Sequence, residues 1–205
     1  MSHESNASGE FAYDAEQDLQ QRLSLATVEH TTRGFLFTAT LKVVRELGKS
    51  EAVAQRCLAA SGEKSFTEFF NYPTSSLLKL IIEAARALSG KFGSFEEALR
   101  QIGYKAGESY MDTPLGKSAQ QKVKADPQQF MSTLQAIYWV MTNYGQPSVA
   151  WTGPKSGALI IQRTFIPPAF HEGGGRAIAK KLGMPQVTVH TKRTGPLSIE
   201  LEFSW

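Results

Sequence analysis

Two short segments combine glycine with a basic residue, a combination that can bind phosphate through backbone N–H groups. Residues 116–118, Gly-Lys-Ser, resemble the end of a phosphate-binding loop. That loop needs a glycine five positions before its second glycine, where Met111 stands. Residues 153–157 lie between two expected strands rather than before a helix, which favours a hairpin turn. Neither segment predicts a nucleotide site.

A third segment, formed by Gly173, Gly174, Gly175 and Arg176, stands near the start of an expected helix. Bare backbone N–H groups and an arginine could hold an anion there. Close packing of the helix on a sheet, at positions that admit no side chain, explains the same residues. We favour packing and keep the anion site as the alternative.

Histidine and cysteine, common ligands of zinc and common catalytic groups, form no motif. The four histidines, His3, His30, His171 and His190, include no pair at i, i+4, so the fold alone would have to assemble a zinc site or a triad. Cys57 is the single cysteine, which excludes an intramolecular disulfide and a cysteine zinc site. No acid–base pair or nucleophile is presented. We therefore predict a protein that is not an enzyme and has no metal or cofactor.

Four aromatic residues are candidates for lining an apolar pocket: Phe69, Tyr72, Trp139 and Trp151. Aromatic rings supply contact area, and the polar tips of Tyr and Trp orient a ligand. Trp139 lies on an expected helix and Trp151 on the following strand, so the two rings could meet between helices and sheet. The alternative for each residue is an ordinary place in the core.

Composition predicts one domain. The chain has 205 residues, 41% of them hydrophobic, which is enough for one sizeable core. Residues 1–12 are rich in Ser, Asn, Gly and Glu and are predicted to be a disordered leader, with a single α+β domain over residues 13–205. The net charge is +3 and the basic residues form no long block, which argues against nucleic acid as a partner. No signal peptide and no apolar run of ~20 residues is found, so we predict a cytoplasmic protein without a membrane span.

Helical periodicity fills the first two-thirds of the chain. Apolar residues recur at helical spacing, between capping residues, over residues 14–25, 32–47, 51–60, 77–88, 94–110 and 126–144. Residues 77–88 are apolar around most of their circumference, so we expect them to form the central buried helix.

The period then changes to two. Residues 149–152 and 158–165 are expected to form one hairpin and residues 187–205 another, with a helix over residues 170–182 between them. A turn centred on Gly195 would place Val189 opposite Leu201, Val187 opposite Phe203, His190 opposite Glu200 and Thr188 opposite Glu202. The expected fold is α+β, a helical layer followed by a four-stranded antiparallel sheet, which argues against an alternating βαβ enzyme.

Several short segments carry a family resemblance. Residues 99–110, with Gly103 and Gly107 in a helix-Gly-x-x-x-Gly-helix stretch, resemble vinyl-reductase-type ligand-binding domains and the TRAPP vesicle-tethering subunits. Residues 32–37, Tyr72-Pro73, residues 95–103 and the closing residues 202–205 resemble a myxobacterial paralogous family of unknown function. The resemblance covers about residues 33–205.

The resemblance implies a fold of the kind found in nitric-oxide signalling and Golgi-transport proteins. Relatives enclose a small molecule or a lipid chain between helices and sheet and often pair through helical faces. The superfamily also includes haem-based sensors and zinc-containing phenol sensors. We predict neither a metal nor a haem for this chain, because Cys57 is its single cysteine and no histidine has a recognisable haem-ligand context.

Two functional hypotheses follow. The first is a regulatory or sensor domain with a pocket for a small apolar ligand or lipid, acting with a signalling partner. The alternative is a protein-interaction adaptor without ligand. Both allow a homodimer, which we expect to form through the helix over residues 32–47.

Overall fold

The computed structural model describes residues 14–123 and 126–205, and the predicted leader over residues 1–12 lies outside them. Its helices are α1 (Ala15–Leu25), α2 (Gly34–Gly48), α3 (Glu51–Ser61), α4 (Thr74–Phe92), α5 (Phe95–Met111), α6 (Pro114–Val123), α7 (Pro127–Met141) and α8 (Pro168–Lys181). Its strands are β1 (Thr31–Arg33), β2 (Asn71–Pro73), β3 (Gln146–Gly153), β4 (Ser156–Gln162), β5 (Thr188–Gly195) and β6 (Ser198–Ser204). The start of the predicted domain at residue 13 stays a prediction.

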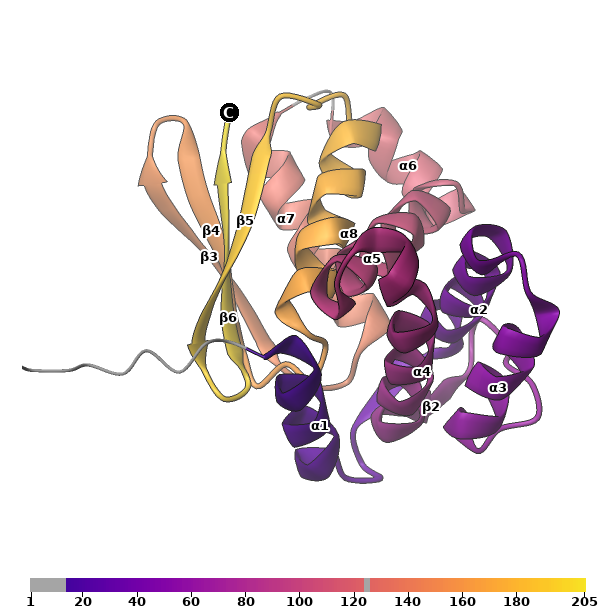
Figure 1. The fold of residues 1–205 in the computed structure, drawn as a ribbon. Helices are drawn as coiled ribbons and strands as arrows, with labels where there is room; N and C mark the ends of the chain where they lie inside the picture. The colour runs from indigo at the N-terminus through magenta and orange to yellow at the C-terminus, as the bar shows by residue number, and fades with distance from the viewer. Residues whose placement is uncertain (1–13, 124–125) are drawn as a thin grey trace, which may run out of the picture.

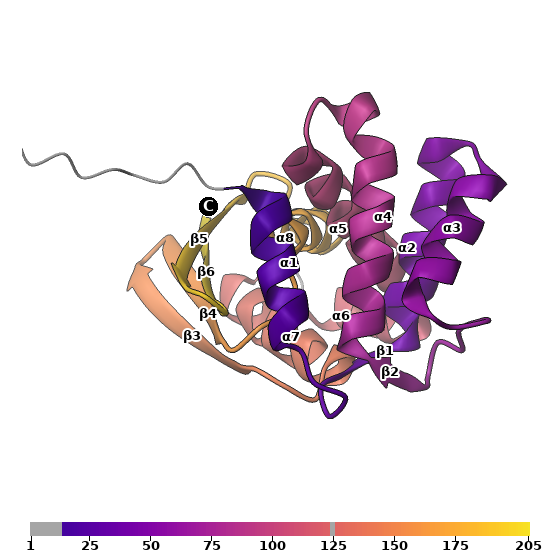
Figure 2. The same ribbon diagram turned by 60° about the horizontal axis from the view of Figure 1, so that its bottom comes forward.

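The sheet forms one side of the molecule, and the helices cover a single face of it (Figure 1). Helix α7 contacts β3 and β4, and α8 contacts β5 and β6. Helices α5, α4, α2 and α3 follow at increasing distance from the sheet, and α1 lies between the sheet and α4 (Figure 2). The predicted α+β fold, helices followed by a four-stranded antiparallel sheet in the order β3-β4-β6-β5, is confirmed.

The register of the second hairpin differs from the predicted one. Val189 lies opposite Phe203, His190 opposite Glu202, Thr188 opposite Ser204 and Thr191 opposite Leu201. The predicted pairs Val189–Leu201, Val187–Phe203, His190–Glu200 and Thr188–Glu202 are therefore wrong by two positions. The turn encloses Pro196 and Leu197, because Gly195 pairs with Ser198. Proline suits the second position of a turn, since its ring fixes φ near −65°.

Two expectations about the helical layer are also corrected. Residues 32 and 33 belong to β1, which pairs with β2 in a two-stranded ribbon, so α2 begins at Gly34. Helix α6 was not predicted. Residues 116–118 within it stand out in the sequence only because they resemble the end of a phosphate-binding loop.

Helix α4 is the central buried helix, as expected, although it is longer than residues 77–88. The buried residues of α4 include Leu77, Leu78, Leu80, Ile81 and Ile82. Across the residues that the structure describes, no helix combines the length and the apolar character that crossing a membrane requires.

Candidate functional site

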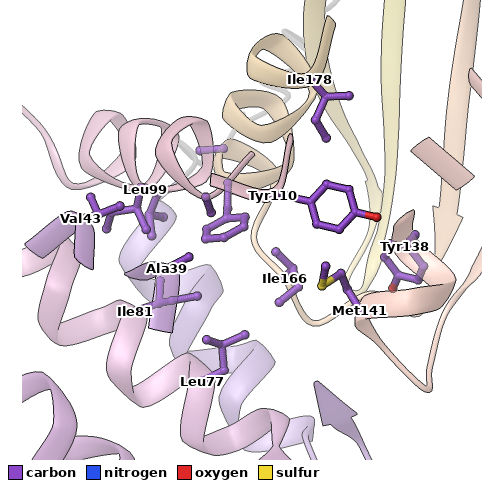
Figure 3. Close-up of a cluster of buried hydrophobic side chains, with 14 of the residues drawn as sticks. Ala39, Val43, Leu77, Ile81, Leu99, Tyr110, Tyr138, Met141, Ile166 and Ile178 are labelled. Carbon is purple, nitrogen blue, oxygen red and sulfur yellow. The ribbon is translucent and has the colours of Figure 1, made fainter. Parts of the chain in front are cut away.

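A narrow apolar cavity of about 100 Å³ lies between the helices and the sheet. Helices α2, α5, α7 and α8 and the inner faces of β4 and β6 form its walls. The lining includes Phe35, Ala106, Tyr110, Leu134, Tyr138, Met141, Leu159, Ile161, Ile166, His171, Ile178 and Leu201. Figure 3 shows Tyr110, Tyr138, Met141, Ile166 and Ile178 converging on this region from different elements.

Glycines on α5 and α8 hold one side of the cavity together. A Cβ at Gly103 would lie 2.1 Å from the carbonyl oxygen of Phe170, and a Cβ at Gly173 would lie 1.9 Å from that of Arg100. Both distances are far below any van der Waals contact, so only glycine allows these two helices to approach so closely. This contact fixes α8 against α5 beside the cavity, which Gly103 itself lines.

His171 on α8 is a polar group in the cavity wall. Its Nε2 lies 3.1 Å from Oγ1 of Thr164, and its ring stacks on Tyr138 with 6.0 Å between centroids. Burial, aided by the positive charge of Arg22, lowers the pKa of His171 to about 3. The imidazole is therefore neutral at neutral pH.

Two tyrosine hydroxyls at the cavity make no hydrogen bond with the described residues. Tyr110 is only 8% exposed, and burial alone raises its pKa. Its ring projects from α5 toward the sheet, and its oxygen ends near Tyr138 and Met141 (Figure 3). Tyr138 has no partner of hydrogen-bond geometry for its hydroxyl, which packs against Gly145. Burial raises the pKa of Tyr138, and Thr164, Thr142 and Arg22 oppose that rise.

A buried ion pair supports the loop that carries Thr164 and Ile166. Arg22 on α1 is fully buried, and its Nε donates to Oδ2 of Asp18 at 2.6 Å. Its Nη1 donates to the carbonyl oxygen of Thr164 at 2.8 Å. Arg193 adds a second cation, 3.3 Å from the other oxygen of Asp18. Helix α1 thus positions the residue that holds His171.

The structure places the four predicted pocket residues outside this cavity. Phe69, Trp139 and Trp151 are 76%, 53% and 47% exposed, and Tyr72 is half-buried against Phe37 and Phe66. Trp139 follows the inward Tyr138, but successive helical side chains turn by about 100°. Trp151 packs on Trp205, with 5.9 Å between ring centroids. The expected meeting of the two indoles between helices and sheet is wrong, and ligand contact at the four residues stays a prediction.

The glycine run is also placed differently. Because α8 begins at Pro168, Gly173, Gly174 and Gly175 lie inside the helix rather than near its start, and their backbone groups belong to its hydrogen-bond ladder. Arg176 pairs with Glu172 at 2.6 Å and donates to the carbonyl oxygen of Val189 at 3.1 Å. Close packing is therefore the better explanation, although Gly173 packs on α5 and not on the sheet. Anion binding at these residues stays a prediction.

The residues that form the cavity carry no signal in the sequence that marks them as a site. Tyr110 and Tyr138 lie in stretches where apolar residues recur at helical spacing, and this spacing does not distinguish a tyrosine beside a void from one that is fully packed. His171 stood alone in the sequence. Among the described residues, no group of His, Cys, Asp and Glu side chains could hold a metal ion.

Residues 25–205 match the family described as "Protein of unknown function (DUF2378)". The chain belongs to the DUF2378 family. A family of unknown function was predicted, and that is confirmed. No curated protein is similar to this DUF2378 chain at a significant level.

Solved structures of H-NOX proteins share the fold. A structure on the molecular mechanism of H-NOX activation is 12% identical, with a TM-score of 0.62 over 84% of this chain and 95% of that one. The Fe(II) unliganded H-NOX protein from K. algicida is 16% identical, with a TM-score of 0.55 over 84% and 95%. An oxygen binding H-NOX domain related to soluble guanylate cyclases is 11% identical, with a TM-score of 0.58 over 84% and 94%.

At these identities the likeness establishes the fold alone. The expected ligand-binding-domain fold is therefore confirmed in its H-NOX form. The more specific likeness to vinyl-reductase-type domains and TRAPP subunits stays a prediction.

Two of the similar structures concern a haem, and a haem does not fit the DUF2378 cavity. The volume of about 100 Å³ is below the roughly 150 Å³ of an engineered cavity that binds benzene, and a porphyrin is several times larger than benzene. The described lining residues include no Lys or Arg that could pair with the two carboxylates of a haem. We therefore assign no role to haem in this chain.

Proposed function

We propose that the protein is a regulatory or sensor domain, without enzymatic activity, that binds a small apolar molecule in the cavity between helices and sheet. The observation that carries this proposal is the cavity itself, an apolar space at the meeting point of α5, α7, α8 and the sheet. The H-NOX fold, used by sensor domains, supports it.

The size and chemistry of the cavity favour a compact ligand over a lipid chain. A somewhat larger apolar cavity, of roughly 150 Å³, stays dry and takes up benzene or xenon, because water finds no hydrogen-bond partners there. A ligand would gain dispersion contacts that the surrounding side chains lack in the empty protein. It would also touch both α7 and α8, so binding would favour one spacing of these helices and offer a signal to a protein partner.

Methionine NMR tests this proposal directly. Met141 lines the cavity, whereas Met184 is buried elsewhere. In protein labelled with 13C at the methionine methyls, benzene should shift the Met141 signal saturably and leave the Met184 signal in place. A Met141 signal that does not respond to benzene or xenon would contradict the proposal and favour an adaptor without ligand.

A matched pair of substitutions on α5 supplies the control. Ala106 lines the cavity, and Ala98 is fully buried away from it. Ala106→Ile should fill the space, abolish the benzene response and change stability little. Ala98→Ile should lower the free energy of unfolding by about 1–3 kcal/mol, because a packed site has no room for three more carbons. Equal destabilisation of both variants in urea would show that the cavity accepts no added volume.

An exposed apolar patch supports interaction with a second copy of the chain as a second candidate function. The patch comprises Phe69, Phe70, Trp139 and Val140, all exposed. Arg33 joins its two halves by donating to the carbonyl oxygens of Phe69 at 2.6 Å and Val140 at 3.2 Å. Such a patch is more typical of an interface than of free surface.

This patch is a better candidate for a homodimer interface than α2, whose apolar side is buried within the chain. Phe70→Ser should convert a dimer to a monomer in sedimentation, whereas Leu115→Ser, at an exposed leucine on α6, should not. A monomer at tens of micromolar in the unmodified protein would contradict this second proposal. A cytoplasmic location stays a prediction.

A further inference from the structure

The hydroxyl of Tyr110 is a polar group of the cavity wall that the described residues leave without a hydrogen-bond partner, and unlike the hydroxyl of Tyr138 it is not sealed from solvent. Tyr110 is nine-tenths buried, and no described residue forms a hydrogen bond with its hydroxyl. Its oxygen points away from α5 and toward the sheet, near Met141 and Tyr138 (Figure 3). This oxygen is not among the side-chain atoms that are sealed from solvent without a partner, so a small molecule in the cavity can reach it.

A second buried tyrosine shows what the fold does elsewhere. Tyr144 is also buried, and its hydroxyl lies 3.2 Å from Oγ1 of Thr32, which in turn lies 2.8 Å from Oγ1 of Thr74. The chain thus supplies hydroxyl partners to a tyrosine outside the cavity and supplies none to Tyr110. A ligand in the cavity is the partner that Tyr110 could meet.

The rest of the lining restricts the charge of that ligand. Among the described lining residues there is no Asp, Glu, Lys or Arg, and His171 already faces Thr164. A charged ligand would lose its hydration without gaining an opposite charge, which strongly disfavours its binding. The ligand must therefore be neutral. A phenolic O–H is a good hydrogen-bond donor, so the group that it meets is an acceptor.

We infer that Tyr110 anchors a neutral, mainly apolar ligand of about benzene size through one hydrogen-bond-accepting oxygen, as in a small ketone. This inference rests on the proposed ligand-binding function and adds the chemical class of the ligand. Tyr110 provides the selectivity, and the surrounding apolar side chains provide contact area.

Cyclopentanone and methylenecyclopentane are suitable probes, because they share a five-membered ring. Cyclopentanone has a carbonyl oxygen where methylenecyclopentane has a CH₂ group, which cannot accept a hydrogen bond. Tyr110→Phe should weaken cyclopentanone binding by about three- to tenfold, the value of one neutral hydrogen bond, as measured from the Met141 methyl shift. The affinity for methylenecyclopentane should stay within about twofold. Equal effects on both probes, or no effect on either, would overturn the inference.

The stability of the empty variants provides the matched control. Tyr110→Phe should leave the Tm unchanged, since the hydroxyl has no partner to lose. Tyr144→Phe should lower the Tm by roughly 2–4 °C and leave the ratio of the two affinities unchanged. In the unmodified protein, the 13Cζ signal of Tyr110 should move with cyclopentanone and not with methylenecyclopentane, which tests the contact without any substitution.

The outcomes separate this inference from the proposed function. One outcome is that benzene shifts the Met141 signal but Tyr110→Phe changes the affinity of neither probe. The cavity would then be a ligand site, and Tyr110 would not be its anchor. If benzene and both probes leave Met141 unshifted, both proposals are wrong.

Discussion

Helix α8 has two sides that differ in how they are packed. Toward α5, Gly173 and Gly103 bring the two backbones into direct contact. Toward α7 and the sheet, larger side chains such as Tyr138 and Ile178 surround a cavity of about 100 Å³. The same helix is therefore held closely on one side and leaves space on the other, so the cavity is a local feature and not a sign of loose packing throughout.

Charge reinforces the closely packed side. Glu172 is buried and pairs with Arg100 of α5 at 2.9 Å and with Arg176 at 2.6 Å. One carboxylate thus links α5 to α8 and also accepts from the backbone N–H of Thr191 on β5 at 3.2 Å. His171, the residue before Glu172, lies on the cavity side. A fixed α8 preserves the empty space beside it, because its position is set by the contact of Gly173 and the ion pair of Glu172, and neither of these residues lines the cavity.

Gly173→Ala should have the largest effect, because it disrupts the side of α8 that packs closely on α5. The new Cβ would lie 1.9 Å from the backbone oxygen of Arg100, so the helices would have to separate. We expect the free energy of unfolding, measured in urea, to fall by about 4 kcal/mol or more.

Gly174→Ala is the control for this substitution. Its Cβ would lie 3.6 Å from the backbone oxygen of Gly103, which is an ordinary contact. Because alanine favours a helix over glycine by about 1 kcal/mol, this variant should be as stable as the unmodified protein or slightly more so. Similar losses at both positions would mean that general helix packing, rather than the contact of Gly173, decides stability.

Leu99 and Leu134 compare the two kinds of packing with the same deletion. Leu99 on α5 is fully buried in the core, and Leu134 on α7 lines the cavity. Leu99→Ala should cost about 4 kcal/mol in urea unfolding, and Leu134→Ala about 2 kcal/mol, because a side chain beside a void has fewer contacts to lose. Equal costs would show that the wall at Leu134 is as well packed as the core.

The sequence predicted most of the fold, because most of the helices and the strands of the four-stranded sheet have a local signal. Asp14 caps α1 by accepting from the backbone N–H groups of Glu16 and Gln17, and period-two alternation marks the strands. The hairpin register was wrong because a shift by two residues leaves every side chain on the same face. The ribbon of β1 and β2 was missed because three-residue strands far apart in the sequence show no periodicity.

The cavity could not be predicted from the sequence in the same way. Its walls come from α2, α5, α7, α8 and the sheet, so its existence depends on the spacing of elements rather than on any local pattern. The choice of Trp139 and Trp151 rested on residue type, and helical rotation and strand position turned both outward. Gly103 and Gly107 were the informative residues, although the resemblance identified them only as part of a family pattern.

Acid titration tests the cavity side of α8 alone. The pKa of His171 falls from 6.5 to about 3 in the folded protein, chiefly through burial. Between these values the unfolded chain binds a proton that the folded protein does not, so stability falls as the pH drops from 6.5 toward 3. A single group contributes a slope of at most about 1.4 kcal/mol per pH unit. His171→Gln should remove this contribution, whereas His190→Gln, on an exposed position of β5, should keep it. If urea unfolding between pH 6.5 and 4.5 gave parallel losses for the unmodified protein and His171→Gln, the imidazole would be protonated in the folded state. A charged His171 would then be hydrated, and the wall of the cavity would be polar rather than dry at the point where α8 meets α7.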